Sequence, residues 1–258
     1  MADYPRYTPD CVLITGASGD FGKAFAWRFA ALGCKLILHG RDAAKISALQ
    51  SELGDSVETH ALIFDITDRA AMESALAAIP AGFQDIDLLV NNAGLALGLD
   101  KAYEADLDDW ERMVEVDVLG LIRMTRLIIG GMARRKRGHI VNIGSTAGNY
   151  PYQGGNVYGA AKAFVKQFSL GLRADLQGTA IRVTNIEPAQ VETQFSAVRF
   201  KGDRARAQSV YAGTVSLNAE DVAESVVWAA TLPPHVNINR LEIMPTMQYF
   251  AGLAMERF

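Results

Sequence analysis

Tyr158 and Lys162 lie four residues apart in the segment YGAAK, thirteen residues after Ser145. On a helix this spacing places both side chains on one face, one turn apart. A phenol with an ordinary pKa near ~10 is a poor acid–base catalyst at neutral pH, but a cation held beside it favours the phenolate and lowers that pKa. Tyr158 can then protonate a carbonyl oxygen or remove a hydroxyl proton, while Ser145 holds the same oxygen. An ordinary amphipathic helix with a surface lysine has the same spacing.

A glycine-rich segment, TGASGDFG, follows the first apolar run and opens the first helical pattern. In that position backbone N–H groups face a phosphate at a helix N-terminus. We expect Gly16 to form the tight turn, Gly22 to allow close helix–strand packing, and Ser18 to donate a hydroxyl; Phe21 belongs to the same contact set. Asp20 is unexpected in this set, because a carboxylate repels phosphate. We expect it to cap the following helix, with its side chain turned from the pyrophosphate.

The second apolar run ends in HGRD. At this point an acidic residue holds the ribose 2′-OH of NAD, whereas an arginine accommodates the 2′-phosphate of NADP. Arg41 therefore predicts NADP(H) as the cofactor. We expect Asp42 to cap the next helix and His39 to be a packing residue.

The third and fourth apolar runs end in FDITD and NNAG. We expect Asp65 to accept a hydrogen bond from the adenine amino group, with Ile66 against the ring; the alternative for Asp65 is a helix cap. Asn92, Ala93 and Gly94 are expected beside the ribose and nicotinamide, since two of them are small. Because the carboxyl ends of parallel strands share one edge of a sheet, all these residues point to one site.

Short apolar runs alternate with helical patterns along most of the chain. The runs that we interpret as strands are 11–16, 35–40, 58–65, 87–94, 138–145, 181–188 and 240–245. The clearest helical patterns cover 21–32, 43–53 and 70–79. This alternation predicts an α/β fold, a Rossmann-type doubly wound parallel sheet with helices on both faces, in a single domain over residues 1–258.

The composition excludes several classes of partner. With 50% hydrophobic and 21% charged residues and a formal net charge of -4, the chain gives no electrostatic reason to bind nucleic acid or an anionic membrane. No apolar run approaches the roughly 18 residues of a membrane span, and the N-terminus does not resemble a signal peptide. Cys11 and Cys34 are interpreted as small core residues and not as a disulfide, which is typical of a protein in a reducing compartment. We therefore expect a cytoplasmic protein, and we assign no metal.

Two segments fall outside the alternation. The polar segment 194–218 follows the sixth strand. It is interpreted as a lid over the site or, alternatively, as a solvated helical insertion. The stretch 245–258 is apolar for a chain end; it either packs on its own core or forms a subunit contact.

Four motifs together resemble the short-chain dehydrogenase/reductase family over nearly the whole chain: TGASGDFG, NNAG, Ser145 with YGAAK, and EPAQVET. Within this family the chain is most similar to NADP-dependent 3-hydroxy acid dehydrogenases, in stretches such as LVNNAGLALG and GGNVYGAAKAFVKQFSL. The resemblance implies that Ser145, Tyr158 and Lys162 are catalytic, and that Tyr158 and Lys162 also contact the cofactor. It further implies a homotetramer. Three residues are implied to flank the nicotinamide: Pro188, Val191 and Thr193.

The chain departs from the family pattern at two places. Where the family has an asparagine that completes a catalytic tetrad, this chain has Asp117. The resemblance implies that this residue contributes largely a backbone carbonyl that holds a relay water, a role open to Asp117. The family's Pro-Gly pair after the sixth strand is Pro188-Ala189 here, in a loop that is one residue shorter.

The expected substrate region is rich in polar groups. Asn149, Tyr150 and Gln153 precede Tyr158, and Gln190 lies on the shortened loop. These residues are either solvent-facing substitutions or part of a pocket for a sulfonate, which has three acceptor oxygens. Arg199 in the segment 194–218 can close over a carboxylate or a sulfonate, or is a surface charge.

The expected activity is NADPH-dependent reduction of a short aldehyde with an anionic head, of the malonic semialdehyde type. The reaction is reversible toward 3-hydroxy acids such as serine. Since sulfoacetaldehyde reductases resemble the same subgroup, reduction of sulfoacetaldehyde to isethionate is one alternative. A non-catalytic NADP-binding regulator is the other.

Overall fold

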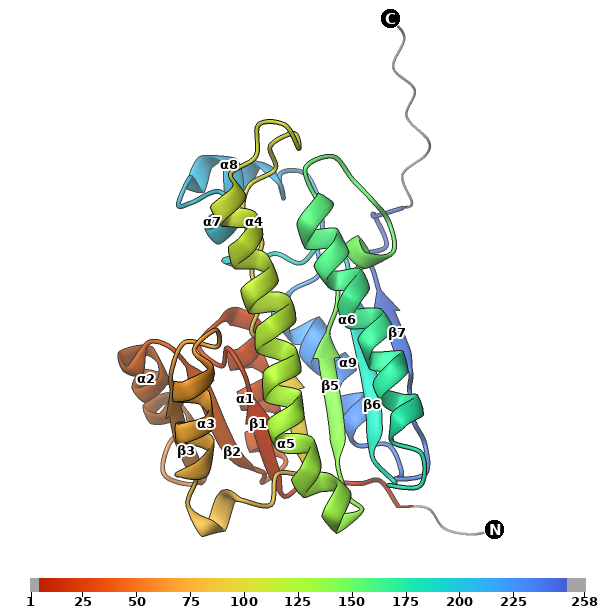
Figure 1. The fold of residues 1–258 in the computed structure, drawn as a ribbon. Helices are drawn as coiled ribbons and strands as arrows, with labels where there is room; N and C mark the ends of the chain where they lie inside the picture. The colour runs from red at the N-terminus through yellow and green to blue at the C-terminus, as the bar shows by residue number, and fades with distance from the viewer. Residues whose placement is uncertain (1–4, 250–258) are drawn as a thin grey trace, which may run out of the picture.

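Seven short strands form one parallel sheet in the middle of this computed structural model, which describes residues 5–249 (Figure 1). Their order is β3-β2-β1-β4-β5-β6-β7. The strands are β1 (Cys11–Ile14), β2 (Lys35–Gly40), β3 (Thr59–Ile63), β4 (Leu88–Asn91), β5 (His139–Ile143), β6 (Arg182–Pro188) and β7 (Arg240–Ile243). The order reverses between β1 and β4, and ligands bind at such a switch point in open α/β sheets.

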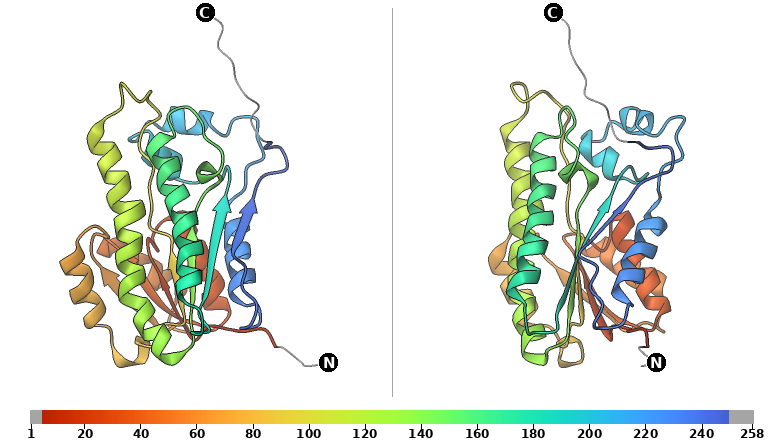
Figure 2. Two further views of the ribbon diagram at one scale, coloured as in Figure 1. Left: turned by 45° about the vertical axis from the view of Figure 1, so that its right-hand side comes forward. Right: turned by 90° about the vertical axis from the view of Figure 1, so that its right-hand side faces the viewer.

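Helices cover both faces of the sheet (Figure 2). They are α1 (Asp20–Ala31), α2 (Ala43–Leu53), α3 (Arg69–Ala77), α4 (Leu107–Val114), α5 (Leu121–Arg135), α6 (Asn156–Asp175), α7 (Phe195–Arg199), α8 (Arg204–Ser209) and α9 (Ala219–Ala230). Shorter turns are the 3-10 helices η1 (Ala81–Phe83) and η3 (Thr146–Gly148) and the π-helix η2 (Glu115–Gly120). Val12 and Ile14 pack under α1, α2 and α9, whereas Leu13 packs under α3 and α5.

The predicted doubly wound sheet is confirmed, with every predicted strand present. Most strands end before the predicted runs do. In the fourth run, β4 ends at Asn91 and residues 92–94 leave the ladder. The last residues of these predicted runs form loops that line the site. Several of them are apolar or small for that reason, although they do not belong to a strand.

The two cysteines belong to the hydrophobic core, as the sequence predicts. Cys11 and Cys34 are buried free thiols, and burial raises the pKa of each to about 12. Within residues 5–249, no helix is long and apolar enough to cross a membrane. Residues 250–258 of the apolar stretch 245–258 lie outside the described residues. The choice between packing on the core and forming a subunit contact therefore stays open.

His39, near the end of β2, lies behind the glycine-rich turn. Its Nε2 is 3.2 Å from the carbonyl oxygen of Phe64, and its Nδ1 accepts a 3.4 Å hydrogen bond from the N–H of Gly16. The ring also packs on Phe64, with centroids 4.2 Å apart. Because only a neutral imidazole donates at one nitrogen and accepts at the other, His39 supports the turn in its uncharged form. Burial lowers its pKa to about 4.

We predict that the free energy of unfolding decreases as the pH falls from about 6.5 toward about 4. In that range the unfolded chain's histidine takes up a proton that folded His39 does not, so the stability that His39 contributes above pH 6.5 is lost. A shift of this size corresponds to about 3 kcal/mol. Urea unfolding between pH 4 and 7 measures it. His39→Gln should flatten the curve, and identical curves for the two proteins would contradict the prediction.

Candidate active site

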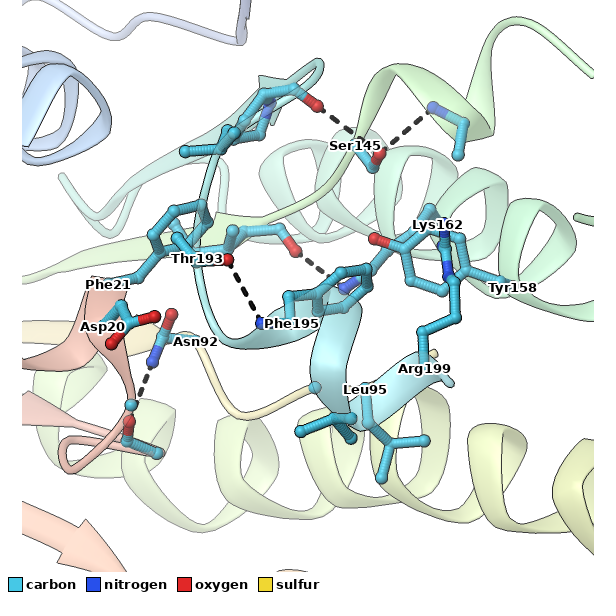
Figure 3. A pocket seen from close by; sticks show the side chains of 18 of the residues that line it. Asp20, Phe21, Asn92, Leu95, Ser145, Tyr158, Lys162, Thr193, Phe195 and Arg199 are labelled. Atoms are coloured by element: carbon cyan, nitrogen blue, oxygen red, sulfur yellow. Dashed lines mark hydrogen bonds between the residues drawn. The ribbon is translucent and has the colours of Figure 1, made fainter. Parts of the chain in front are cut away.

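A pocket of about 710 Å³ opens at the carboxyl edge of the sheet (Figure 3). It gathers most of the residues predicted from sequence: Gly16, Ser18, Asp20, Phe21, Arg41, Asp65, Ile66, Asn92, Ala93, Gly94, Ser145, Tyr150, Tyr158, Lys162, Pro188, Gln190, Val191, Thr193 and Arg199. The predicted residues that do not line it are Gly22, Asp117, Asn149 and Gln153. Figure 3 shows Asp20, Phe21 and Asn92 at one end and Tyr158, Lys162 and Arg199 at the other.

Tyr158 and Lys162 share one face of α6, as their spacing predicts. The Lys162 Nζ lies 5.6 Å from the centroid of the Tyr158 ring and donates a 3.1 Å hydrogen bond to the carbonyl oxygen of Ile143. Lys162 is buried, whereas Tyr158 is half-buried. The fixed ammonium of Lys162 therefore faces a phenol that a substrate can reach.

Ser145 follows β5 and precedes η3. Its Oγ accepts a 3.1 Å hydrogen bond from the N–H of Ala147 and donates a 3.4 Å bond to the carbonyl oxygen of Pro188. The first contact fixes the side chain. The second is long, so the hydroxyl proton can be redirected to a substrate oxygen at small cost.

Asp117 lies in the π-helix η2 and is fully buried next to Lys162. Its Oδ1 accepts a 3.1 Å hydrogen bond from the N–H of Leu95 and lies 3.4 Å from the Lys162 Nζ. A Cβ on Gly94 would come within 2.5 Å of this oxygen, so glycine makes room for the pair. Oδ2 is buried and has no hydrogen-bond partner in the described part of the chain.

The Asp117–Lys162 ion pair determines the charge of the lysine. Burial acts to lower the pKa of Lys162, but the interactions with Asp117 and Tyr158 together outweigh it and raise that pKa. Burial also raises the pKa of Asp117, against the opposing effect of Lys162. The Asp117 side chain thus favours the protonated form of Lys162, a contribution that the sequence did not predict. The predicted role of the Asp117 backbone carbonyl stays a prediction.

The glycine-rich turn has the geometry that its sequence predicts. Gly16 has a φ of +64°, which favours glycine, and a Cβ on Gly22 would lie 2.3 Å from the Gly16 oxygen. The Asn92 side-chain amide donates to the carbonyl oxygens of Thr15 at 2.8 Å and Gly16 at 3.1 Å. Gly22 therefore supports the turn by close packing, and Asn92 braces it by hydrogen bonds.

The prediction that Asp20 caps α1 is wrong. The N-cap is Gly19, which has extended backbone and no side-chain cap hydrogen bond. Asp20 is already the first helical residue, one position too late to cap. Its Oδ2 instead accepts a 2.6 Å hydrogen bond from the N–H of Gln194. Its predicted orientation relative to a pyrophosphate stays a prediction.

Arg41 and Asp42 are neighbours in sequence but differ in their contacts, as the sequence predicts. Asp42 caps α2 by accepting a 3.1 Å hydrogen bond from the N–H of Lys45. Arg41 is exposed at the pocket and makes no ion pair or hydrogen bond with any residue in 5–249. An unpaired guanidinium at this strand end is suited to a phosphate.

Asp65 is held as an acceptor by neighbours that the sequence pattern did not predict. It accepts hydrogen bonds from the N–H and hydroxyl of Thr67, at 3.0 and 2.8 Å, and from Arg112 at 2.8 Å. Burial acts to raise the pKa of Asp65, but these hydrogen bonds outweigh it and lower the pKa to about 2. The alternative that Asp65 caps a helix is wrong, because the cap of α3 is Asp68.

Two polar residues predicted to bind the substrate lie outside the pocket. The Asn149 amide donates to Glu187 at 2.7 Å and to Glu242 at 2.8 Å, and its oxygen accepts from Lys166 at 2.7 Å. These contacts hold Asn149 in the scaffold, which argues against a substrate contact. Gln153 is exposed, away from the pocket lining.

Tyr150 and Gln190 line the pocket but are engaged within the protein. Tyr150 donates a 3.1 Å hydrogen bond from its hydroxyl to Glu242. The Gln190 amide donates to the Val210 carbonyl oxygen and the Ser216 hydroxyl, both at 3.1 Å. Gln190 therefore holds the segment 194–218 in place, and its amide is not free for a ligand.

Arg199, at the end of α7, lies among three aromatic rings. Its guanidinium carbon is 5.2 Å from the Tyr158 ring centroid and 5.0 Å from that of Phe195, and Nη2 donates a 3.1 Å hydrogen bond to the Tyr152 hydroxyl. The Arg199 Nε is buried without a hydrogen-bond partner among residues 5–249. A cation with an unused donor next to Tyr158 is suited to an anionic group.

Sequence reasoning missed Tyr152, Phe195 and Arg112 as pocket residues. Tyr152 lies in the sequence between Tyr150 and Gln153, the two neighbours that were predicted to bind the substrate. Phe195 and Arg112 come from segments that lie over the strand ends. No local sequence pattern reveals that position.

Comparison with known proteins identifies the family. A family model described as short chain dehydrogenase matches residues 10–204. The NADP-dependent 3-hydroxy acid dehydrogenase YdfG of Salmonella typhi is 56% identical over 247 residues, which cover 95% of this chain and 99% of that protein. The chain belongs to the short-chain dehydrogenase family.

Two further relatives agree with this assignment. Serine 3-dehydrogenase of Agrobacterium fabrum is 49% identical over 246 residues, covering 95% of this chain and 98% of that protein. A solved structure described as the closed form of serine dehydrogenase complexed with NADP+ has a TM-score of 0.93 and 53% identity, covering 96% of this chain and 100% of that one. The predicted family and the oxidoreductase class are confirmed.

For this short-chain dehydrogenase we predict that Lys162→Met lowers the free energy of unfolding by about 3 kcal/mol, because it leaves Asp117 buried and unpaired. Since burial raises the pKa of Asp117, the loss should become smaller as the pH falls from 8 to 5, because the unpaired carboxyl takes up a proton more readily. Urea unfolding at both pH values measures the effect. The double variant Lys162→Met/Asp117→Asn should recover most of it; equal stability of the single and double variants would refute the ion-pair interpretation.

Proposed function

We propose that this chain is an NADP(H)-dependent oxidoreductase that interconverts a short aldehyde with an anionic head, of the malonic semialdehyde type, and the 3-hydroxy acid. Oxidation of 3-hydroxy acids such as serine is the reverse direction. The observation that carries the anionic head is the unpartnered, buried Nε of Arg199 beside Tyr158. The activities named for the relatives, NADP-dependent 3-hydroxy acid dehydrogenase and serine 3-dehydrogenase, support the same class.

The residues present fit an NADP(H) molecule lying across the strand ends. The turn at Gly16 would receive the pyrophosphate, the unpaired Arg41 the 2′-phosphate, and the ionised Asp65 the adenine amino group. Ala93 and Gly94 line the pocket where the nicotinamide end would lie. When bound, the nicotinamide supplies or accepts the hydride.

The protein's own residues manage the proton and the substrate's position. Tyr158 donates its hydroxyl proton to the carbonyl oxygen during reduction and receives it back during oxidation. Ser145 donates a hydrogen bond to the same oxygen, and Lys162 stabilises the phenolate that remains. Arg199 binds the anionic head, and the segment 194–218 acts as a lid that brings it over Tyr158.

Two alternatives are less well supported. Sulfoacetaldehyde reduction to isethionate needs donors for three sulfonate oxygens, but the amides of Asn149 and Gln190 are held by other protein groups. A non-catalytic NADP-binding regulator has no need of the fixed ammonium of Lys162 beside an accessible Tyr158.

The homotetramer and the cytoplasmic location stay predictions. Exposed apolar side chains gather along α4, α5 and α6, which supports an interface between copies of the chain. They are Leu107, Val114, Leu127, Phe164 and Leu170.

For the cofactor, Arg41→Ala should raise the KM for NADPH roughly tenfold or more and leave that for NADH nearly unchanged, because a charge-assisted contact to the 2′-phosphate is lost. Initial rates with each cofactor measure this difference. An equal effect on both would remove the basis for assigning NADP(H).

For the substrate, kcat/KM should be highest with malonic semialdehyde or serine and lower with sulfoacetaldehyde. Arg199→Met should lower kcat/KM for the acidic aldehyde at least tenfold and spare a neutral aldehyde such as propanal. Arg204→Met is the matched control, since Arg204 is exposed on α8 away from the pocket. Negligible rates on all three acidic substrates, or unchanged turnover in Tyr158→Phe, would contradict the proposed reaction.

A further inference from the structure

The segment 194–218 is fastened along its length by contacts to the rest of the protein. The Gln190 amide binds Val210 and Ser216 near its far end. The Lys201 Nζ lies 2.8 Å from Asp109 of α4, and the Arg199 carbonyl oxygen accepts a 2.9 Å hydrogen bond from the N–H of Gly98. These contacts hold its middle and end. At its start, the Tyr211 hydroxyl contacts the Ser196 hydroxyl and donates to the Val191 carbonyl oxygen, and one further contact comes from the glycine-rich turn.

Asp20 supplies that contact at the start of the segment. Its Oδ2 accepts the 2.6 Å hydrogen bond from the N–H of Gln194, a residue 174 positions away in sequence. Gln194 is the N-cap of α7, the helix that carries Phe195 and Arg199 into the pocket. The angle at which α7 leaves the sheet is therefore set in part by a side chain of the glycine-rich turn.

A carboxylate is unfavourable in a turn that binds phosphate, and the contact with Gln194 gives a reason for its presence there. Asp20 lies in the first turn of α1, and a negative charge at that place repels a phosphate bound at the same turn. A charged acceptor forms a stronger hydrogen bond to a backbone N–H than a neutral one does. The contact with Gln194 uses that strength, and it directs the carboxylate toward the segment.

We propose that Asp20 is a positioning residue that latches the lid, residues 194–218, onto the cofactor-binding turn. One hydrogen bond then joins the two ends of the pocket, so that Arg199 is held over Tyr158 by the turn that receives the pyrophosphate. The proposal rests on the proposed function for its kinetic consequence only, because the contact itself joins two residues of the chain.

Limited trypsin digestion of the full chain tests the latch without any ligand. The lid contains trypsin sites at Arg199, Lys201, Arg204 and Arg206, and mass spectrometry identifies cleavage there. Asp20→Ala should increase the rate of cleavage within 199–206 about fivefold, the effect of losing one hydrogen bond. Asp20→Asn keeps a side-chain acceptor, so its cleavage rate should lie between those of the unmodified protein and Asp20→Ala.

The matched control is Asp68→Ala, which removes a carboxylate that accepts a 3.0 Å hydrogen bond from the N–H of Ala71 at the start of α3. It should leave cleavage of the lid unchanged even if it lowers the melting temperature. Unchanged cleavage in Asp20→Ala, or equal rates in Asp20→Ala and Asp20→Asn, would overturn the proposal. An increase in Asp68→Ala as large as in Asp20→Ala would also overturn it, because general destabilisation would then explain the result.

Kinetics give a second readout that separates the latch from the proposed function. In Asp20→Ala the KM for the acidic aldehyde should rise severalfold while kcat falls less, because Tyr158 and Lys162 are not displaced. A fall in kcat alone would contradict a latch. If no substrate is turned over by the unmodified protein, the proposed function fails while the digestion result still decides the latch.

Discussion

The attraction between the buried Lys162 ammonium and the Asp117 carboxylate opposes the effect of burial, which disfavours the positive charge of the lysine. The neighbouring structure serves this pair. The π-helix η2 brings Asp117 inward, and glycine at position 94 leaves room for the Asp117 carboxylate. The carbonyl oxygen of Ile143 at the end of β5 accepts a further hydrogen bond from Lys162. Tyr158 can then face a fixed cation and still remain open to a substrate.

Charge is distributed along the pocket in a consistent way. Arg41 lies at one end and Arg199 at the other, and in residues 5–249 the former has no partner and the latter has an unused Nε donor. The carboxylates nearby are each engaged by donors: Asp65 by Arg112, Asp117 by Lys162, and Asp20 by the backbone of Gln194. Positive charge is thus left available at both ends, as a ligand with a phosphate at one end and an acid at the other requires.

Much of this arrangement could be predicted from the sequence. The strands β1, β2, β4, β5 and β6 are buried almost throughout, so their apolar runs are easy to identify. Parallel strands also bring their carboxyl ends together. The polar residues around the substrate region could not be assigned in this way. Asn149 is held by Glu187 and Glu242 from β6 and β7, and no local pattern indicates that partners so far along the chain will take up its donors.

The sequence by itself determined the sheet, the glycine-rich turn, the Tyr158–Lys162 pair and the family, because each depends on local spacing or on the periodic burial of apolar residues. Only the tertiary structure decided what the charged and polar side chains contact. Asp20 illustrates the difference: by position it was expected to cap α1, yet its carboxylate accepts from Gln194. A hydrogen-bond acceptor binds the donor that folding brings nearest, and that donor is set by how distant segments pack.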